Sequence, residues 1–95
     1  MTRYTVLWDE DVEGPFIDAW VAGDSRLRAI LTEAANWVDA NLAEDPDRKG
    51  QPVFDQSTRV IAVPVSEASA RVSATYQYFP DERQVRVICL ILRGI

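Results

Sequence analysis

Four arginines in the second half of the chain are the residues best suited to binding an anion. A guanidinium group can bind a phosphate or a carboxylate through two parallel hydrogen bonds. These side chains could therefore contact a nucleic acid or an acidic partner protein, although solvated strand positions that balance nearby acids also carry arginine. The four positions are Arg59, Arg71, Arg86 and Arg93.

Most familiar catalytic and metal-binding arrangements are excluded by composition. The sequence has no histidine, so it lacks the usual general base near neutral pH and the commonest metal ligand. Its single cysteine, Cys89, excludes an internal disulfide and a thiolate-clustered metal site. The acids between Asp9 and Glu13 favour a helix start over a cation site, because the helix macrodipole stabilises carboxylates there. We therefore predict no metal and no cofactor.

Charge is distributed unevenly along the chain. The net charge is −5, yet residues 1–47 carry −8 and residues 48–95 carry +3. A general nucleic-acid binder would normally be basic, so the overall balance argues against that class. The basic second half still permits a local positive patch.

Length and hydrophobic pattern predict a single domain, residues 1–95. Of the 95 residues, 47% are hydrophobic and 26% are charged, as in an ordinary globular protein. The longest apolar run, 87–92, is much shorter than the ~18 residues that a membrane span requires. The first residues lack the pattern of a signal peptide. We expect no membrane association and a cytoplasmic location.

Hydrophobic residues at helical spacing predict two helices joined by a short turn. Gly23 ends the first apolar stripe, and Asp24 or Ser25 can cap a second helix that extends to about residue 42. Two such helices form an αα-hairpin. The first stripe is made by Val12, Phe16 and Trp20.

Runs of β-branched and aromatic residues predict strands on both sides of this hairpin. Residues 44–58 are rich in Asp, Pro and Gly and are predicted to be a loop, and Pro64 predicts an edge strand or a bend. The fold class is therefore α+β, with the order β-α-α-β-β-β and a largely antiparallel sheet. The strands are expected at 4–8, 59–65, 70–79 and 84–92, with a hairpin loop at 80–83.

The last predicted strand is apolar on both faces. Two helices can cover only one face, so a curled sheet, a second copy or a partner must shield the other. In the neighbouring strand, Tyr76 shares one face with the apolar Val72 and Ala74, which favours packing in the core. We predict that Arg71 and Arg86 lie side by side. Together with Ile88, Leu90 and Leu92, which alternation places on one face, they are the candidate partner-binding residues.

The order of these elements resembles the RelE/ParE toxin superfamily of bacterial toxin–antitoxin modules, which include plasmid-stabilisation systems. The resemblance implies that the antitoxin holds the toxin inactive, and that the target is mRNA in the ribosomal A site or, in ParE-like members, DNA gyrase. The similar segments are YTVLW at 4–8, DP at 45–46, RV at 59–60, TYQYFPDE at 75–82 and VICLILRG at 87–94.

The resemblance also suggests catalytic candidates. Arg59, Tyr76 and Arg93 match positions that RNA-cutting members use on a basic, aromatic surface. Two departures weaken that match. Ser73 stands where those members commonly have arginine, and only two residues follow Arg93, where they carry a catalytic His, Tyr or Lys.

We therefore expect a toxin-like protein that acts through protein contact with an antitoxin, with gyrase or with another target. One alternative is a ribosome-dependent mRNA endoribonuclease in which Arg59, Arg71 and Arg93 hold the mRNA backbone. The missing acid–base groups favour a protein that is not an enzyme. A further alternative is a non-toxic homodimeric binding module.

Overall fold

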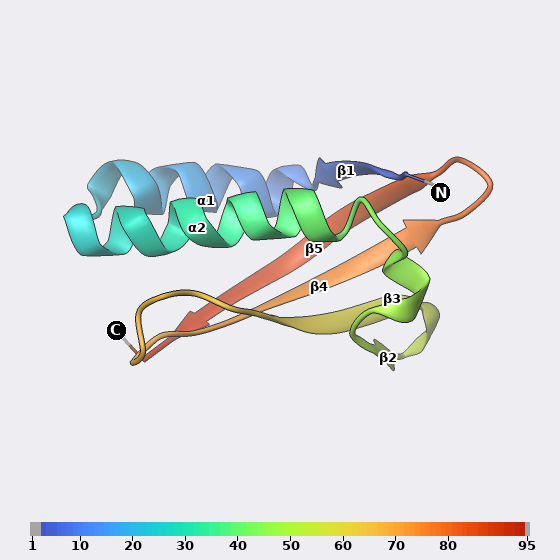
Figure 1. Ribbon diagram of the computed structural model, residues 1–95. Coiled ribbons are helices and arrows are strands. Elements are labelled where there is room, and N and C mark those ends of the chain that lie inside the picture. Colours follow the sequence, from blue (N-terminus) through green and yellow to red (C-terminus); the bar gives the residue numbers. More distant parts are fainter. Residues whose placement is uncertain (1–2, 95) are drawn as a thin grey trace.

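A five-stranded sheet carries two helices on one of its faces (Figure 1). The computed structural model describes residues 3–94. The elements are β1 (Thr5–Trp8), α1 (Glu10–Ala22), α2 (Ser25–Asn41), the 3-10 helix η1 (Pro46–Arg48), β2 (Gln51–Val53), β3 (Asp55–Val63), β4 (Arg71–Phe79) and β5 (Gln84–Arg93). The strand order is β1-β5-β4-β3-β2, with β1 parallel to β5 and the other pairs antiparallel. This arrangement confirms the predicted α+β class.

Local side-chain caps define the helical hairpin. The Asp24 carboxylate accepts a 2.9 Å hydrogen bond from the Leu27 amide and so caps the start of α2. Asp9 caps α1 in the same way. Arg28 donates to the carbonyl oxygens of Trp20 and Val21 in the last turn of α1, where backbone acceptors run short of helical partners. The predicted αα-hairpin is confirmed, and neither of its helices is long and apolar enough to span a membrane.

The hydrophobic core lies between the helices and the sheet. Ala34 and Val38 of α2 are fully buried there, and Tyr76 is the largest side chain with no exposed surface. The predicted face of β4 is confirmed, because Val72, Ala74 and Tyr76 all belong to this core. The remaining buried members from the strands are Val63, Val85 and Val87.

The segment predicted to be a loop, 44–58, contains η1, β2 and the start of β3. That prediction was wrong in part, and the sheet has one strand more than expected. Gly50 turns the chain with a φ of +64°, and β2 then pairs with β3 through Gln51–Val60 and Pro52–Arg59. A three-residue strand that contains proline has no local signal, because its pairing depends on a separate segment. Pro64 follows the last residue of β3.

A bulge interrupts the pairing of β4 with β5. Tyr76 lies opposite Val87, whereas the preceding Thr75 lies opposite Cys89, so Ile88 is an extra residue in β5. A bulge of this kind reverses the alternation of side chains beyond it. The face assignment predicted for the second half of β5 was therefore wrong.

Beyond the bulge, apolar side chains of β5 turn toward the helices. Leu90 lies opposite the buried Ala74, and Leu92 lies opposite the buried Val72. Both leucines pack against the core. The helices thus cover part of the apolar surface of β5 that was expected to be shielded by a curled sheet, a second copy or a partner. Ile91 instead lies on the helix-free face and is 40% exposed.

Candidate functional site

Two of the candidate catalytic residues, Arg59 and Tyr76, lie side by side on β3 and β4. The Tyr76 hydroxyl is 2.7 Å from the Pro46 carbonyl oxygen and 2.8 Å from that of Lys49. Arg59 donates to the carbonyl oxygens of Lys49, at 2.7 Å, and of Gly50, at 3.2 Å. Both side chains therefore hold the 46–50 segment against the sheet.

The environment of Tyr76 makes it a poor proton donor or acceptor. Burial raises the pKa of its phenol to about 12, even though the neighbouring Arg59 guanidinium acts in the opposite direction. A group that ionises so far from neutral pH is badly matched to general acid–base catalysis. The contacts of this pair indicate a structural role.

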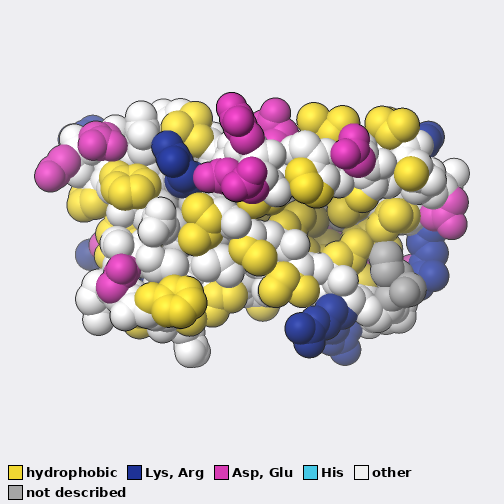
Figure 2. Space-filling model, turned by 180° about the vertical axis from the view of Figure 1, so that it is seen from behind, with side chains coloured by type: hydrophobic (Ala, Val, Ile, Leu, Met, Phe, Trp, Pro, Cys, Tyr) yellow, Lys and Arg dark blue, Asp and Glu magenta, His cyan; other side chains and the backbone are white. Residues whose placement is uncertain are grey.

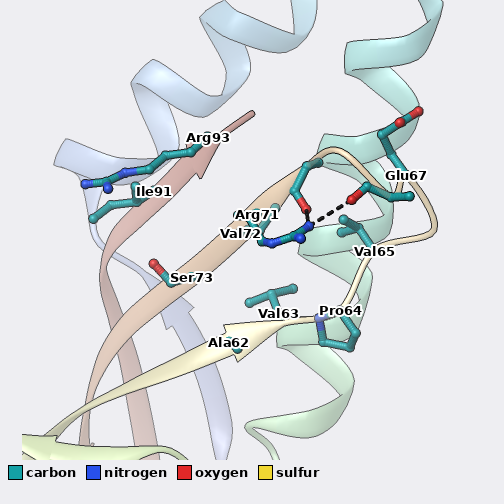
Figure 3. A pocket seen from close by; sticks show the side chains of 12 residues that line it. Ala62, Val63, Pro64, Val65, Glu67, Arg71, Val72, Ser73, Ile91 and Arg93 are labelled. Carbon is teal, nitrogen blue, oxygen red and sulfur yellow. Dashed lines mark hydrogen bonds between the residues drawn. The ribbon is translucent and has the colours of Figure 1, made fainter. Parts of the chain in front are cut away.

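The third candidate, Arg93, lies at the other end of the sheet, opposite Arg71. A hollow of about 710 Å³ is lined by both arginines, by Ser73 and Ile91, and by part of the segment between β3 and β4. Arg71 donates to two carbonyl oxygens of that segment. Figure 3 shows that the Arg93 side chain extends away from that of Arg71. The two guanidinium groups therefore share a hollow without converging on one point.

Among the described residues that line this hollow, Glu67 is the one carboxylate. It accepts a hydrogen bond from Arg26 at 3.2 Å. Hydrogen bonds from Arg26 and Ser69 lower the pKa of Glu67, so it is ionised and engaged at neutral pH. The hollow has groups that bind an anion, but its described residues offer no evident proton acceptor.

Arg86 is distant from the other arginines of the last hairpin. It is exposed and lies opposite Gln77, whereas Arg71 lies opposite Arg93. The six residue steps from 71 to 77 along β4 correspond to about 20 Å. The prediction that Arg71 and Arg86 are neighbours was therefore wrong, because they lie at opposite ends of the β4–β5 hairpin.

An apolar groove runs between α1 and β5. Its volume is about 390 Å³, and Asp11 contributes the carboxylate at its edge. Figure 2 shows hydrophobic side chains gathered in a hollow, with acidic side chains on the helix layer above it and basic side chains below. The predicted partner-binding residues Ile88, Leu90 and Leu92 line this groove and are partly exposed. The helices supply the other apolar walls, mainly through Val12, Phe16, Leu27 and Leu31.

The groove lies beside an unpaired strand edge. β1 pairs with β5 only from Gln84 to Val87, after which the chain enters α1. Over 88–93, the described part of the chain supplies no strand on that side of β5. The edge therefore offers backbone N–H and C=O groups to an added strand. Sequence reasoning missed the helical wall of the groove, for which the apolar stripe through Phe16 was the available signal.

Comparisons with known proteins identify the fold. Neither a protein-family model nor a curated protein matches the sequence. A chain of the toxin–antitoxin complex RelBE2 from Mycobacterium tuberculosis is 18% identical, with a TM-score of 0.68 over 100% of this chain and 97% of that one. The E. coli toxin RelE in the free state, with two of its arginines replaced by alanine, is 15% identical. The TM-score is 0.61, and the match covers 95% of this chain and 82% of that one. The chain thus has a RelE-like toxin fold, as the order of its elements predicted.

Proposed function

We propose that this protein is the toxin-like component of a toxin–antitoxin pair and acts in the cytoplasm by binding other proteins. The observation that carries the proposal is the apolar groove beside the unpaired edge of β5. An extended segment of the antitoxin can add to such an edge through main-chain hydrogen bonds and place alternate side chains in the groove. The RelE-like fold supports this role, since one similar structure is a toxin–antitoxin complex.

The charge around the groove defines the partner segment further. Helix α1 carries four acids and no basic residue, and Asp11 lies at the rim of the groove. The segment that docks there should therefore alternate apolar residues with lysine or arginine. Protein contact is favoured over catalysis because Arg59 and Tyr76 are bonded to the chain's own backbone.

Two matched pairs of variants test the groove in binding to a candidate antitoxin, which is sought among the neighbouring open reading frames. Phe16→Ala and Asp11→Lys alter residues that line the groove, whereas Ile17→Ala and Asp18→Lys alter exposed residues of the same helix outside it. We expect each variant of the first pair to weaken binding about tenfold. Phe16→Ala removes an apolar side chain that the partner would bury, and Asp11→Lys sets a positive charge against the basic residues of the segment. The second pair should change it less than about twofold. Equal effects from both pairs would refute the groove as the docking site.

Induced expression in a bacterial host tests the toxin role. Growth and the 5′ ends of cellular mRNA are followed together. We expect growth arrest without new mRNA ends, because a toxin that binds a protein target stops growth without cutting mRNA. Unimpeded growth would refute the toxin role and leave a binding module, either a homodimer or one with another partner.

A ribosome-dependent endoribonuclease is the second candidate, favoured by the arginines at 71 and 93. Like charges directly opposite each other in a sheet destabilise it, and an RNA backbone lying along the hollow would place a phosphate near each of the two arginines. If arrest is accompanied by new mRNA ends, Arg71→Ala and Arg93→Ala should abolish them. Arg86→Ala is the control, because this exposed arginine lies at the other end of the hairpin.

A further inference from the structure

Phe54 lies at the tip of the turn between β2 and β3, where both its solvent exposure and its backbone conformation are unfavourable for phenylalanine. Its side chain is 98% exposed, the highest value among the exposed large hydrophobic residues. Its backbone is left-handed, with a φ of +62°, a conformation that is sterically disfavoured for a bulky residue and easy for glycine. Folding alone would favour glycine or asparagine here. An observed outlier of this kind points to a function.

The turn holds Phe54 in place from both sides. The Asp55 carboxylate accepts hydrogen bonds from the Ser57 amide, the Ser57 hydroxyl and the Thr58 amide, each at 2.9 Å. On the other side, Arg59 donates to the carbonyl oxygens of the two residues before β2. A side chain presented on a braced turn loses little conformational freedom when it binds.

The surroundings of the tip indicate which class of molecule Phe54 contacts. The only charge in residues 51–56 is the carboxylate of Asp55, and the exposed neighbours Gln51, Pro52 and Gln56 are neutral. A nucleic acid would bring phosphates against that carboxylate, and the guanidinium of Arg59, which pairs with Pro52, is already bonded to the carbonyl oxygens of Lys49 and Gly50. An aromatic side chain beside one acid suits an apolar pocket with a basic residue on its rim. Such a pocket belongs to a protein.

We propose that Phe54 is an anchor that inserts into an apolar pocket of a partner protein. The surface is separate from the groove between α1 and β5, because Phe54 does not line that groove. Figure 1 places the β2–β3 turn at the end of the sheet opposite the C-terminus. The protein can therefore contact one partner through Phe54 while another occupies the groove. The inference does not require the chain to be a toxin.

Photocrosslinking in cells identifies the partner. The photoreactive p-benzoylphenylalanine replaces Phe54 in one variant and the exposed neighbour Gln56 in a control. We expect one protein to be crosslinked far more strongly from position 54 than from position 56. Crosslinks only to nucleic acid, only to a second copy of this chain, or to nothing would each overturn the proposal.

Binding measured with purified components completes the test. The crosslinked protein is identified, purified and titrated with the wild-type chain, Phe54→Gly and Gln56→Ala. We expect Phe54→Gly to raise Kd at least tenfold and Gln56→Ala to change it less than about twofold. The melting temperature of Phe54→Gly should equal or exceed that of the wild type, because glycine adopts the left-handed backbone readily. Unchanged affinity of Phe54→Gly would refute the anchor role.

Discussion

Replacing Tyr76 by phenylalanine isolates the contact that joins the sheet to the 46–50 segment. The substitution keeps the buried ring and removes only the hydroxyl, which lies 2.7 Å and 2.8 Å from the carbonyl oxygens of Pro46 and Lys49. The Pro46 residue is itself fully buried, so water cannot readily replace the lost donor there. We expect the variant to fold with lower stability.

The magnitude follows from how poorly the Pro46 carbonyl oxygen is satisfied without the hydroxyl, because its other donor, the Lys49 amide, lies 3.5 Å away. One buried hydrogen bond contributes about 1 kcal/mol, and an unsatisfied buried carbonyl costs roughly 1–3 kcal/mol. The free energy of unfolding should therefore fall by about 2 kcal/mol, which corresponds to a decrease in Tm of roughly 10 °C for a domain of this size.

Urea denaturation of the wild type and the variant measures this difference. Tyr78→Phe is the matched control, because Tyr78 lies on the same strand and its hydroxyl makes no hydrogen bond to the described residues. The control should lose less than about 0.5 kcal/mol, as is usual away from specific contacts. Equal stability of Tyr76→Phe and wild type would refute the structural role and reopen the case for a catalytic tyrosine.

Three further predictions concern the hairpin, the bulge and the pH dependence. Asp24→Ala should lower the free energy of unfolding by about 1 kcal/mol because it removes the cap of α2; an unchanged urea midpoint would contradict this. Leu90→Ala should lower the free energy of unfolding by about 2 kcal/mol and Ile91→Ala by less than about 1 kcal/mol, because of the two only Leu90 packs against the core. The reverse order of the two effects would contradict the bulge. The pKa of Tyr76 is raised from 10.0 to about 12. The stability that its protonated hydroxyl gives to the folded state is therefore complete below pH 10 and declines as pH rises to about 12. Urea titrations across that interval should show a steeper decline for wild type than for Tyr76→Phe, and parallel curves would refute this.

Local patterns were sufficient for the helical hairpin and for most strands. Apolar spacing, the break at Gly23 and the Asp24 cap act within a few residues, so they can be recognised without the rest of the fold. The segment 44–58 was misjudged because the short strand β2 exists only through pairing with β3. The pairing partner, and not the composition of the segment, makes it a strand.

The candidate site was less predictable than the fold. The resemblance makes Arg59 and Tyr76 catalytic candidates, yet the register of β3 and β4 places them side by side, where both hydrogen-bond to the backbone of the 46–50 segment. Register also separates Arg71 from Arg86 and sets Arg71 opposite Arg93. Positions along a strand do not specify which residue lies across from them, since pairing depends on the whole sheet.

The sequence by itself determined the two long helices and four of the five strands in their order, because side-chain periodicity and caps are properties of neighbouring residues. Only the tertiary structure decided where the apolar residues of β5 face. Every residue from Val87 to Leu92 is apolar, so alternation carries no information there. The extra Ile88 in the pairing with β4 turns Leu90 and Leu92 toward the helices and so builds the groove. A one-residue bulge reverses a strand's faces beyond it, and only the partner strand can reveal it.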